Sequence, residues 1–257
     1  MNNNHYWKDK DKRAKIAKEH TSKMRKFYKE EIENCVKKTI TFSYAVNNPL
    51  KKTNKGQKII LTDEDSVSAL FNFQEEKTCV LNFASYKNPG GMFLKGSKAQ
   101  EECLCHESFL YNVLREFDNT YYAHNRAKLN RSLYTNQALY SPDVRFIHNG
   151  KQTLADVLTC AAPNYSSAEK YCKVSQEENL LVLKDRIKFV LNIASNRGVN
   201  TLILGAWGCG VFSQDPYKVA RYFHEELDYH QDIEKIVFAV TDKKSENYKA
   251  FSKILGF

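Results

Sequence analysis

The chain has 257 residues, of which 42% are hydrophobic, and a formal net charge of +9. This composition supplies enough apolar surface for a folded core and excludes wholesale disorder, and the length suits one α/β domain with additions or two small domains. No apolar run approaches the roughly 18–20 residues that a membrane-spanning helix needs.

The N-terminus and the cysteines indicate where the protein works. The first residues, MNNNHYWKDKDKR, are polar and charged, unlike a secretory signal, so we expect a cytoplasmic protein. The number of cysteines is odd, no CxxC pair occurs, and the CxC at 103–105 has no second pair at zinc-site spacing. We therefore predict reduced thiols rather than a disulfide framework or a structural zinc site. The seven cysteines are Cys35, Cys79, Cys103, Cys105, Cys160, Cys172 and Cys209.

Positive charge is concentrated at the start of the chain. Residues 1–40 hold twelve Lys or Arg against six Asp or Glu, a net charge of +6. An arm of this charge could attract a polyanion through counterion release. The alternative is a solvated helix face whose lysines contact no ligand, and the sequence leaves both interpretations open.

The first predicted elements are a helix over residues 9–33 and a strand over 36–44. The helix carries a broken apolar stripe among its lysines, which is typical of a helix packed on one side. A polar connection is predicted over 47–56 and a short helix over 65–73. The apolar stripe consists of Ile16, Ala17, Met24, Phe27, Tyr28 and Ile32.

From residue 78 onward, strands and helices alternate. Compact apolar strands separated by helices predict an α/β layer structure, with no internal repeat and no interdomain linker. We expect an N-terminal helical extension over 1–45 and a larger domain over 46–257, together forming one structural unit. The predicted order is strand 78–84, helix 100–117, an irregular segment 118–143, strands 144–148 and 154–161, helix 179–197, strand 201–206, helix 216–227, strand 235–240 and helix 246–255.

The segment between strand 78–84 and the next helix carries the first chemical signal. Asn82 lies at the end of the buried strand, where a loop can begin to build a site. The sequence NPGG at 88–91 is a strong turn signal. Its paired glycines let the backbone approach a ligand closely and present N–H groups to phosphate or sugar oxygens.

Two adjacent glutamates follow at the start of the predicted helix. Side chains one residue apart on a helix diverge by about 100°. Glu102 shares a stripe with His106 and Phe109 that faces the protein body, so we expect Glu102 to be more buried than Glu101. A general acid must hold a proton; the helix N-terminus favours the carboxylate, whereas desolvation and a neighbouring carboxylate favour the protonated form. The sequence leaves open which effect prevails, and also whether Gln-Glu-Glu merely complements the helix dipole.

The segment 201–223 repeats the order of strand, loop and helix. Its loop, GAWGCGVFSQDP, contains three glycines, and Asp215 and Pro216 are typical first residues of a helix. Glycine amides ahead of a helix N-terminus favour an anion such as phosphate. Trp207 and Phe212 either stack on a ligand ring or pack in the core.

Together, the two loops resemble the microbial-type poly(ADP-ribose) glycohydrolases, a divergent branch of the macrodomain superfamily. That family carries a glycine triplet, a short spacer and then Gln-Glu-Glu; this chain has Gly90-Gly91-Met92, seven residues, and then Gln-Glu-Glu at 100–102. The resemblance covers residues 60–257 well and the N-terminal helix more loosely. The other segments that resemble the family are NFAS (82–85), NP (88–89), TCAAPN (159–164), GAWGCGVF (205–212), DP (215–216) and VFAVTD (237–242).

The resemblance implies a macrodomain-like three-layer α/β/α sandwich with a mixed central sheet, and it implies no cofactor and no metal. It implies that Glu102 is the catalytic acid and that Glu101 hydrogen-bonds ribose hydroxyls beside the scissile bond. The second loop would cradle the diphosphate, with Phe212 pressing the distal ribose towards Glu102. The residues implied to contact the substrate are Asn82, Ala84, Ser85, Asn88, Gly90, Gly91 and Gln100 on the first loop and Gly205, Gly208, Cys209, Gly210, Val211 and Phe212 on the second.

Met92 departs from the family pattern, because it replaces the third glycine of the triplet. If position 92 needs a positive φ or contacts ribose, a side chain there would change the activity or the substrate.

The function that these motifs predict is hydrolysis of the ribose–ribose O-glycosidic bond of poly(ADP-ribose), by a monomer that binds ADP-ribose or its polymer and no membrane. Three alternatives stay open. The chain could hydrolyse mono-ADP-ribose from protein, nucleic acid or O-acetyl-ADP-ribose. It could be a non-catalytic ADP-ribose-binding macrodomain, or a nucleic-acid-binding protein that uses the basic arm.

Overall fold

The computed structural model describes residues 9–44, 46 and 56–257, which fold around one seven-stranded sheet. The strand order is β1-β4-β5-β3-β6-β7-β2. β4 pairs antiparallel with β1 and β5, and the remaining neighbours are parallel, so the sheet is mixed. The strands are β1 (Ile40–Ser43), β2 (Lys58–Thr62), β3 (Thr78–Phe83), β4 (Gln137–His148), β5 (Lys151–Cys160), β6 (Thr201–Leu204) and β7 (Lys235–Ala239).

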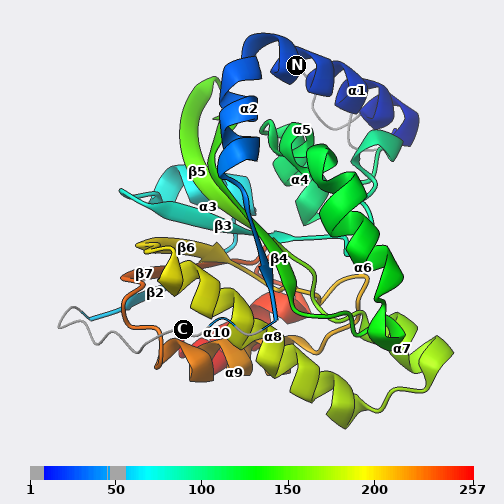
Figure 1. The fold of residues 1–257 in the computed structure, drawn as a ribbon. Coiled ribbons are helices and arrows are strands. Elements are labelled where there is room, and N and C mark those ends of the chain that lie inside the picture. Colours follow the sequence, from blue (N-terminus) through cyan, green and yellow to red (C-terminus); the bar gives the residue numbers. More distant parts are fainter. Residues whose placement is uncertain (1–8, 45, 47–55) are drawn as a thin grey trace.

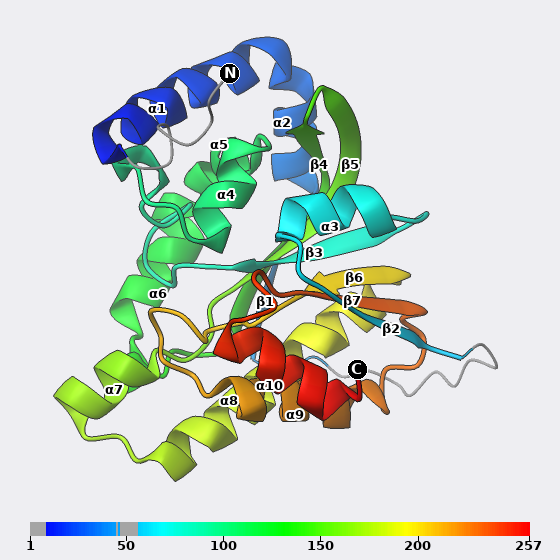
Figure 2. The same ribbon diagram turned by 180° about the vertical axis from the view of Figure 1, so that it is seen from behind.

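Helices cover both faces of this sheet (Figure 1). Because successive strand residues point to opposite faces, Leu81 and Leu202 pack with α8, α9 and α10, whereas Val80 and Ile203 pack with the helices of the other layer. The reverse view shows the same two layers, with α8, α9 and α10 grouped on one side of the strands (Figure 2). The predicted three-layer α/β/α arrangement with a mixed sheet is confirmed. The helices are α1 (Lys10–Phe27), α2 (Lys29–Lys38), α3 (Ser66–Phe73), α4 (Gln100–His106), α5 (Leu110–Leu114), α6 (Ala123–Ala127), α7 (Tyr165–Cys172), α8 (Gln176–Asn196), α9 (Pro216–Leu227) and α10 (Glu246–Leu255).

The predicted N-terminal helix is two helices, because the chain bends at Tyr28 (φ −126°, ψ 30°). Ala17, Met24 and Ile32 are buried, whereas Phe27 is 68% exposed, so only part of the predicted apolar stripe faces the protein. β1 precedes the predicted boundary at residue 45 and is nevertheless a strand of the main sheet. Most of the predicted polar connection, residues 47–55, lies outside the described residues.

The segment predicted to be irregular, 118–143, contains the first half of β4. Residues 137–141 are buried and pair with β1 on one side and β5 on the other. Pro142 and Asp143 lie in a bulge between the two halves of the strand. A proline costs no ladder hydrogen bond at a bulge, so β4 continues on both sides of it and the prediction of an irregular segment up to residue 143 is wrong for residues 137–141.

The helix predicted over 100–117 is interrupted at Glu107–Phe109. Those residues bond to the end of β4 instead: the Ile147 N–H donates to Glu107 O (2.7 Å) and Ser108 forms a bridge with Phe146. The sequence analysis also missed β2, which pairs with β7 at the edge of the sheet, and α7.

All seven cysteines are free thiols. Within residues 9–44, 46 and 56–257, no helix combines the length and the apolar character required to cross a bilayer.

Candidate active site

The two glycine-bearing loops lie side by side at the carboxyl ends of two central strands, because β3 and β6 are parallel neighbours with Val80 opposite Ile203. Loops that follow the carboxyl ends of neighbouring parallel strands form the usual ligand-binding crevice of α/β proteins. Gly205 marks the contact between the two loops. A Cβ at Gly205 would lie 3.1 Å from the ring of Phe83 and 2.5 Å from the carbonyl oxygen of Ala239.

Glu101 is buried at the start of α4, with 3% of its surface exposed. The Ser85 N–H donates to its Oε2 (2.7 Å), and the Asn82 side-chain amide donates to its Oε1 (3.2 Å). Burial raises the pKa of Glu101 to about 8, and the neighbouring Glu102 carboxylate adds to the rise, although the hydrogen bonds from Ser85 and Asn82 oppose it. Burial therefore favours the protonated form of Glu101.

Glu102 is buried nearly as deeply, with 5% of its surface exposed. Its Oε1 accepts the Met92 N–H (2.8 Å), and its Oε2 accepts the Ala99 N–H (2.9 Å). The bond to Ala99 also closes the first turn of α4, as an acidic side chain at the third helical position commonly does. Two backbone donors thus fix the orientation of the Glu102 carboxyl group.

The prediction that Glu102 is more buried than Glu101 is wrong, since Glu101 is 3% exposed and Glu102 is 5% exposed. Helical periodicity predicts only which side of α4 faces the protein body. Here the end of β3 covers the other side, where Asn82 and Ser85 hydrogen-bond Glu101.

The glycine turn lies directly against both carboxyl groups. Gly90 and Gly91 adopt φ values of 63° and 60°. A Cβ at Gly91 would lie 2.6 Å from Glu102 Oε1 and 2.9 Å from Glu101 Oε2, so only a bare backbone fits there. Met92 has φ −110° and ψ 30°, and its side chain is 39% exposed. Position 92 therefore requires no glycine, and it contributes its N–H to Glu102.

Asn82 connects this pair to the sheet. Its side chain is fully buried and also donates to Thr159 Oγ1 (3.3 Å) on β5, while its Oδ1 has no hydrogen-bond partner among the described residues. Ala84 is buried beside it, and the Ser85 hydroxyl accepts the Asn88 N–H (3.2 Å), which shapes the start of the glycine turn.

Gln100 is predicted to contact substrate, but protein groups occupy its side-chain amide. Its Oε1 accepts the Phe83 N–H (2.8 Å), and its Nε2 donates to Leu81 O (2.9 Å) and Ser66 Oγ (3.1 Å). These bonds attach the first turn of α4 to the end of β3 and so place the two glutamates that follow.

The second loop presents free backbone donors. The N–H groups of residues 208 and 210–212 donate to no acceptor among the described residues. Gly208 has φ 79°, and a Cβ there would lie 2.8 Å from the Ala162 Cβ, whereas Gly210 and Val211 are exposed. Asp215 caps α9 by accepting the N–H of Tyr217 (2.8 Å), and Pro216 is its first residue, as predicted. Cys209, between Gly208 and Gly210, is partly buried, and burial raises the pKa of its thiol to about 12.

The two aromatic residues of this loop differ in their surroundings. Trp207 is 1% exposed and packs in the core near Phe223, so for Trp207 the core-packing interpretation holds. Phe212 is partly exposed, and its ring centroid lies 6.1 Å from that of Tyr134.

An aromatic cluster that the sequence analysis missed joins the two loops. Tyr86, from the first loop, stacks on Tyr134 at 4.1 Å between ring centroids, and Phe212 packs against the same cluster. The Asn125 side chain donates to Tyr86 O (3.0 Å). The available signal was the density of Asn and Tyr in the segment 118–143, which is typical of polar groups that hold a loop in place.

No group of three or more His, Cys, Asp or Glu side chains that could hold a metal occurs within the part of the chain that the structure describes.

Known proteins match this chain in sequence and in fold. Residues 1–149 match the family model for the catalytic domain of microbial-type PARG, that is, poly(ADP-ribose) glycohydrolase. The chain is similar to the crystal structure of that enzyme from Thermomonospora curvata, with 29% identity and a TM-score of 0.81 over 94% of this chain and 98% of that one. It is also similar to the enzyme from Deinococcus radiodurans in complex with ADP-ribose, with 31% identity and a TM-score of 0.80 over 88% and 97%. A second Thermomonospora curvata structure, bound to the inhibitor ADP-HPD, is 29% identical with a TM-score of 0.80 over 94% and 98%. The comparison with curated proteins gave no match.

Proposed function

The chain belongs to the family of microbial-type poly(ADP-ribose) glycohydrolases, and from this membership we propose that it releases ADP-ribose by hydrolysing the ribose–ribose O-glycosidic bond of the polymer. The observation that carries the proposal is the buried glutamate pair. Both carboxyl groups lie against the bare backbone of Gly91, at the carboxyl ends of the central strands, where the second loop offers free N–H groups.

In the proposed mechanism, Glu102 gives a proton to the departing ribose oxygen while an oxocarbenium-like centre forms at the anomeric carbon. Glu102, then a carboxylate, activates the water that attacks this centre, so one residue acts first as acid and then as base. Each oxygen of Glu102 accepts one N–H and keeps a lone pair for the transferred proton.

The proton for this step is available within the pair. Burial raises the pKa of Glu101 to about 8, so a carboxyl group that favours its proton lies beside Glu102. We assign the donation to Glu102 and the hydrogen bonding of ribose hydroxyls to Glu101. The same pair thereby holds the substrate and supplies the acid.

The substrate contacts follow from the free groups of the site. We assign the N–H groups of residues 208 and 210–212 to the diphosphate, since unpartnered amides ahead of the N-terminus of α9 favour an anion. Phe212 would press the distal ribose towards Glu102, and the unpartnered Oδ1 of Asn82 would accept a ribose hydroxyl.

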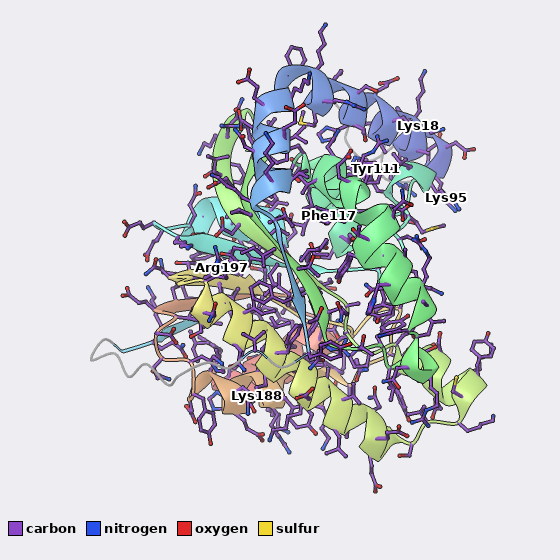
Figure 3. The ribbon with its side chains drawn as sticks, viewed as in Figure 1. Lys18, Lys95, Tyr111, Phe117, Lys188 and Arg197 are labelled. Carbon is purple, nitrogen blue, oxygen red and sulfur yellow. The ribbon has the colours of Figure 1, made fainter. Side chains whose placement is uncertain are left out.

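The basic arm is proposed to contact long polymer outside the catalytic crevice. Lys10, Lys12 and Lys15 are exposed on α1, and Lys8, which belongs to the same group, lies outside the described residues. Figure 3 shows Lys18 on α1 and Lys95 on the neighbouring loop projecting from the same flank of the molecule.

The decisive experiment compares substrates and variants. The parent protein is incubated with poly(ADP-ribose) and, separately, with a mono-ADP-ribosylated acceptor, and free ADP-ribose is measured. We expect release from the polymer, and a loss on the order of 10²–10⁴-fold in turnover for Glu102→Gln, because the amide keeps the shape but has no acidic proton. Glu101→Gln is expected to lose less turnover and more substrate affinity.

Equal turnover by Glu102→Gln and the parent would overturn the assignment of the acid. Release from the mono-ADP-ribosylated acceptor alone would replace the proposed substrate.

A further inference from the structure

Helix α1 packs against the segment that follows the catalytic glycines. We propose that α1, through Arg13, holds this segment and thereby fixes Glu102 in the geometry needed for catalysis. The inference rests on the proposed role of Glu102, and it makes the first helix of the chain a positioning element of the active site.

One hydrogen bond and a short stretch of backbone lead from Glu102 to the surface that α1 covers. The Met92 N–H donates to Glu102 Oε1 (2.8 Å), and Phe93–Lys95 then form one turn of 3₁₀ helix that ends at Gly96. Three residues thus separate Met92, which donates to the carboxyl group, from Gly96, which contacts α1. A displacement of this turn would move the Met92 N–H with it.

Arg13 makes the central contact. Its side chain is buried, with 7% exposed, and its Nε–H donates to Gly96 O (2.7 Å). The backbones also touch, because a Cβ at Gly96 would lie 2.1 Å from Lys10 O and 3.0 Å from Ala14 N. Gly96 has φ 77°, so its conformation and its contact with α1 both suit glycine.

Phe93 attaches the same turn to the neighbouring helices. It is 1% exposed, and its ring centroid lies 4.6 Å from that of His106 on α4 and 5.3 Å from that of Tyr111 on α5. His20 of α1 completes this pocket at 6.4 Å. The turn is therefore enclosed between α1 and the helix that carries the glutamates.

The far half of α1 is also held by hydrogen bonds to residues outside this turn. His20 Nε2 hydrogen-bonds Ser108 O (2.8 Å), and the Asn112 side chain donates to Thr21 O (3.1 Å). Removal of the Arg13 bond therefore leaves α1 docked at its other end, and the expected effect is a local shift of the loop rather than loss of the helix.

Small displacements have large consequences at a catalytic centre, since a misplacement of about 1 Å can cost on the order of 10²-fold in rate. The substrate-binding loop at 205–212 is not part of this path. Loss of the Arg13 contact is expected to lower kcat while sparing the affinity for ADP-ribose.

The test uses Arg13→Met, which keeps the length of the side chain and removes its donors, in the full chain with a short ADP-ribose oligomer as substrate. We expect kcat to fall by about tenfold or more, with KM and ADP-ribose affinity unchanged. Arg13→Lys, which keeps a donor on a similar stem, should recover part of kcat. The matched control is Arg25→Met, an exposed arginine of the same helix outside the lysine group assigned to the polymer, and it should retain parental kcat.

A folded Arg13→Met variant with parental kcat would overturn the proposal, and so would a parallel loss of kcat and ADP-ribose affinity. If Arg13→Met does not fold, Arg13→Lys takes its place: parental kcat in that variant, or a parallel loss of kcat and ADP-ribose affinity, would overturn the proposal. The proposed function fails separately, through turnover by Glu102→Gln. If Glu102→Gln is inactive and Arg13→Met is fully active, only the positioning role of α1 is overturned.

Discussion

Gly91 is the single residue on which the geometry of the glutamate pair depends most. A methyl group there would lie 2.6 Å from Glu102 Oε1, and φ 60° is strained for any L-residue. We predict that Gly91→Ala lowers the free energy of unfolding by about 1–2 kcal/mol through backbone strain and also removes most of the turnover. Denaturant unfolding and a polymer-hydrolysis assay measure the two effects.

Gly150 provides a matched control for this prediction. It has φ 77° in the turn between β4 and β5, and nothing lies within 4 Å of the position of its Cβ. Gly150→Ala should cost a similar free energy and leave the turnover intact. Equal activity losses in both variants would show that strain alone, rather than crowding of the carboxyl groups, explains the effect at Gly91.

Glu101 makes stability depend on pH. Its pKa is raised to about 8 by burial, above the ordinary value of 4.5, so the folded state binds more protons than the unfolded state between these two values. Its contribution to stability is fully present below about pH 4.5 and is lost as the pH rises through about 8. Burial lowers the pKa of His106 to about 4 and that of His20, and these groups give the opposite slope below about pH 6.5.

The difference between the parent and Glu101→Gln isolates this contribution. We predict that the free energy of unfolding of the parent, relative to that of the variant, falls from pH 5 to pH 8, as followed by urea unfolding at about half-unit steps. A difference that stays constant over this interval would contradict a raised pKa for Glu101.

For single residues, the sequence predicted which residues carry the motif better than it predicted their burial and hydrogen-bond partners. The motif spacing located both glutamates and the glycine turn, because these residues are close in the chain. The deep burial of Glu101 and the internal use of Gln100 depend on contacts with β3, 16 to 19 positions away. The contact between Arg13 and Gly96 was not predicted, because the two residues are 83 positions apart.

Among the elements, α1 combines a packed face with a charged one. We predict that charge reversal at Lys8, Lys10, Lys12 and Lys15 weakens the binding of long polymer at low salt and leaves the binding of single ADP-ribose unchanged. The reason is that each added unit of polymer brings further phosphates to the arm, and the gain falls as salt screens them. Binding titrations at several salt concentrations with long and short ligands measure this.

The control reverses four exposed lysines on other elements. Parental polymer affinity in the α1 variant would show that its lysines only solvate the helix. The control positions are Lys170, Lys188, Lys244 and Lys249.

The elements that depend on local sequence signals were predicted well, and those that depend on residues far away in the chain were not. Strands β3, β6 and β7 and helices α9 and α10 were predicted closely, because their apolar runs and caps are local signals. β2 is five residues long, and only its pairing with β7 makes it a strand. The break after α4 depends on the end of β4, which has no signature in the sequence of the helix itself.

For the whole molecule, ADP-ribose should stabilise the fold, because it would bind between two loops that join at the aromatic cluster, at the carboxyl ends of the central strands. At a ligand concentration of about 100 times Kd, the expected gain in the free energy of unfolding is about 2.7 kcal/mol. The melting temperature should therefore rise with ADP-ribose concentration in a thermal-unfolding experiment. An unchanged melting temperature at millimolar ADP-ribose would count against the assigned crevice.

The position of β2 also determines when the protein can finish folding. Lys58 pairs with Lys235, so this edge of the sheet joins positions that are 177 residues apart. On the ribosome, the glycine turn and the glutamates are synthesised long before β7. β2 stays unpaired until β7 has emerged. Pairing over such distances closes a large loop and is slow, on the order of milliseconds to seconds for β-rich topologies. Activity is therefore expected to appear only after β7 has emerged, and a nascent chain truncated before residue 235 should expose the unpaired edge to aggregation or to a chaperone.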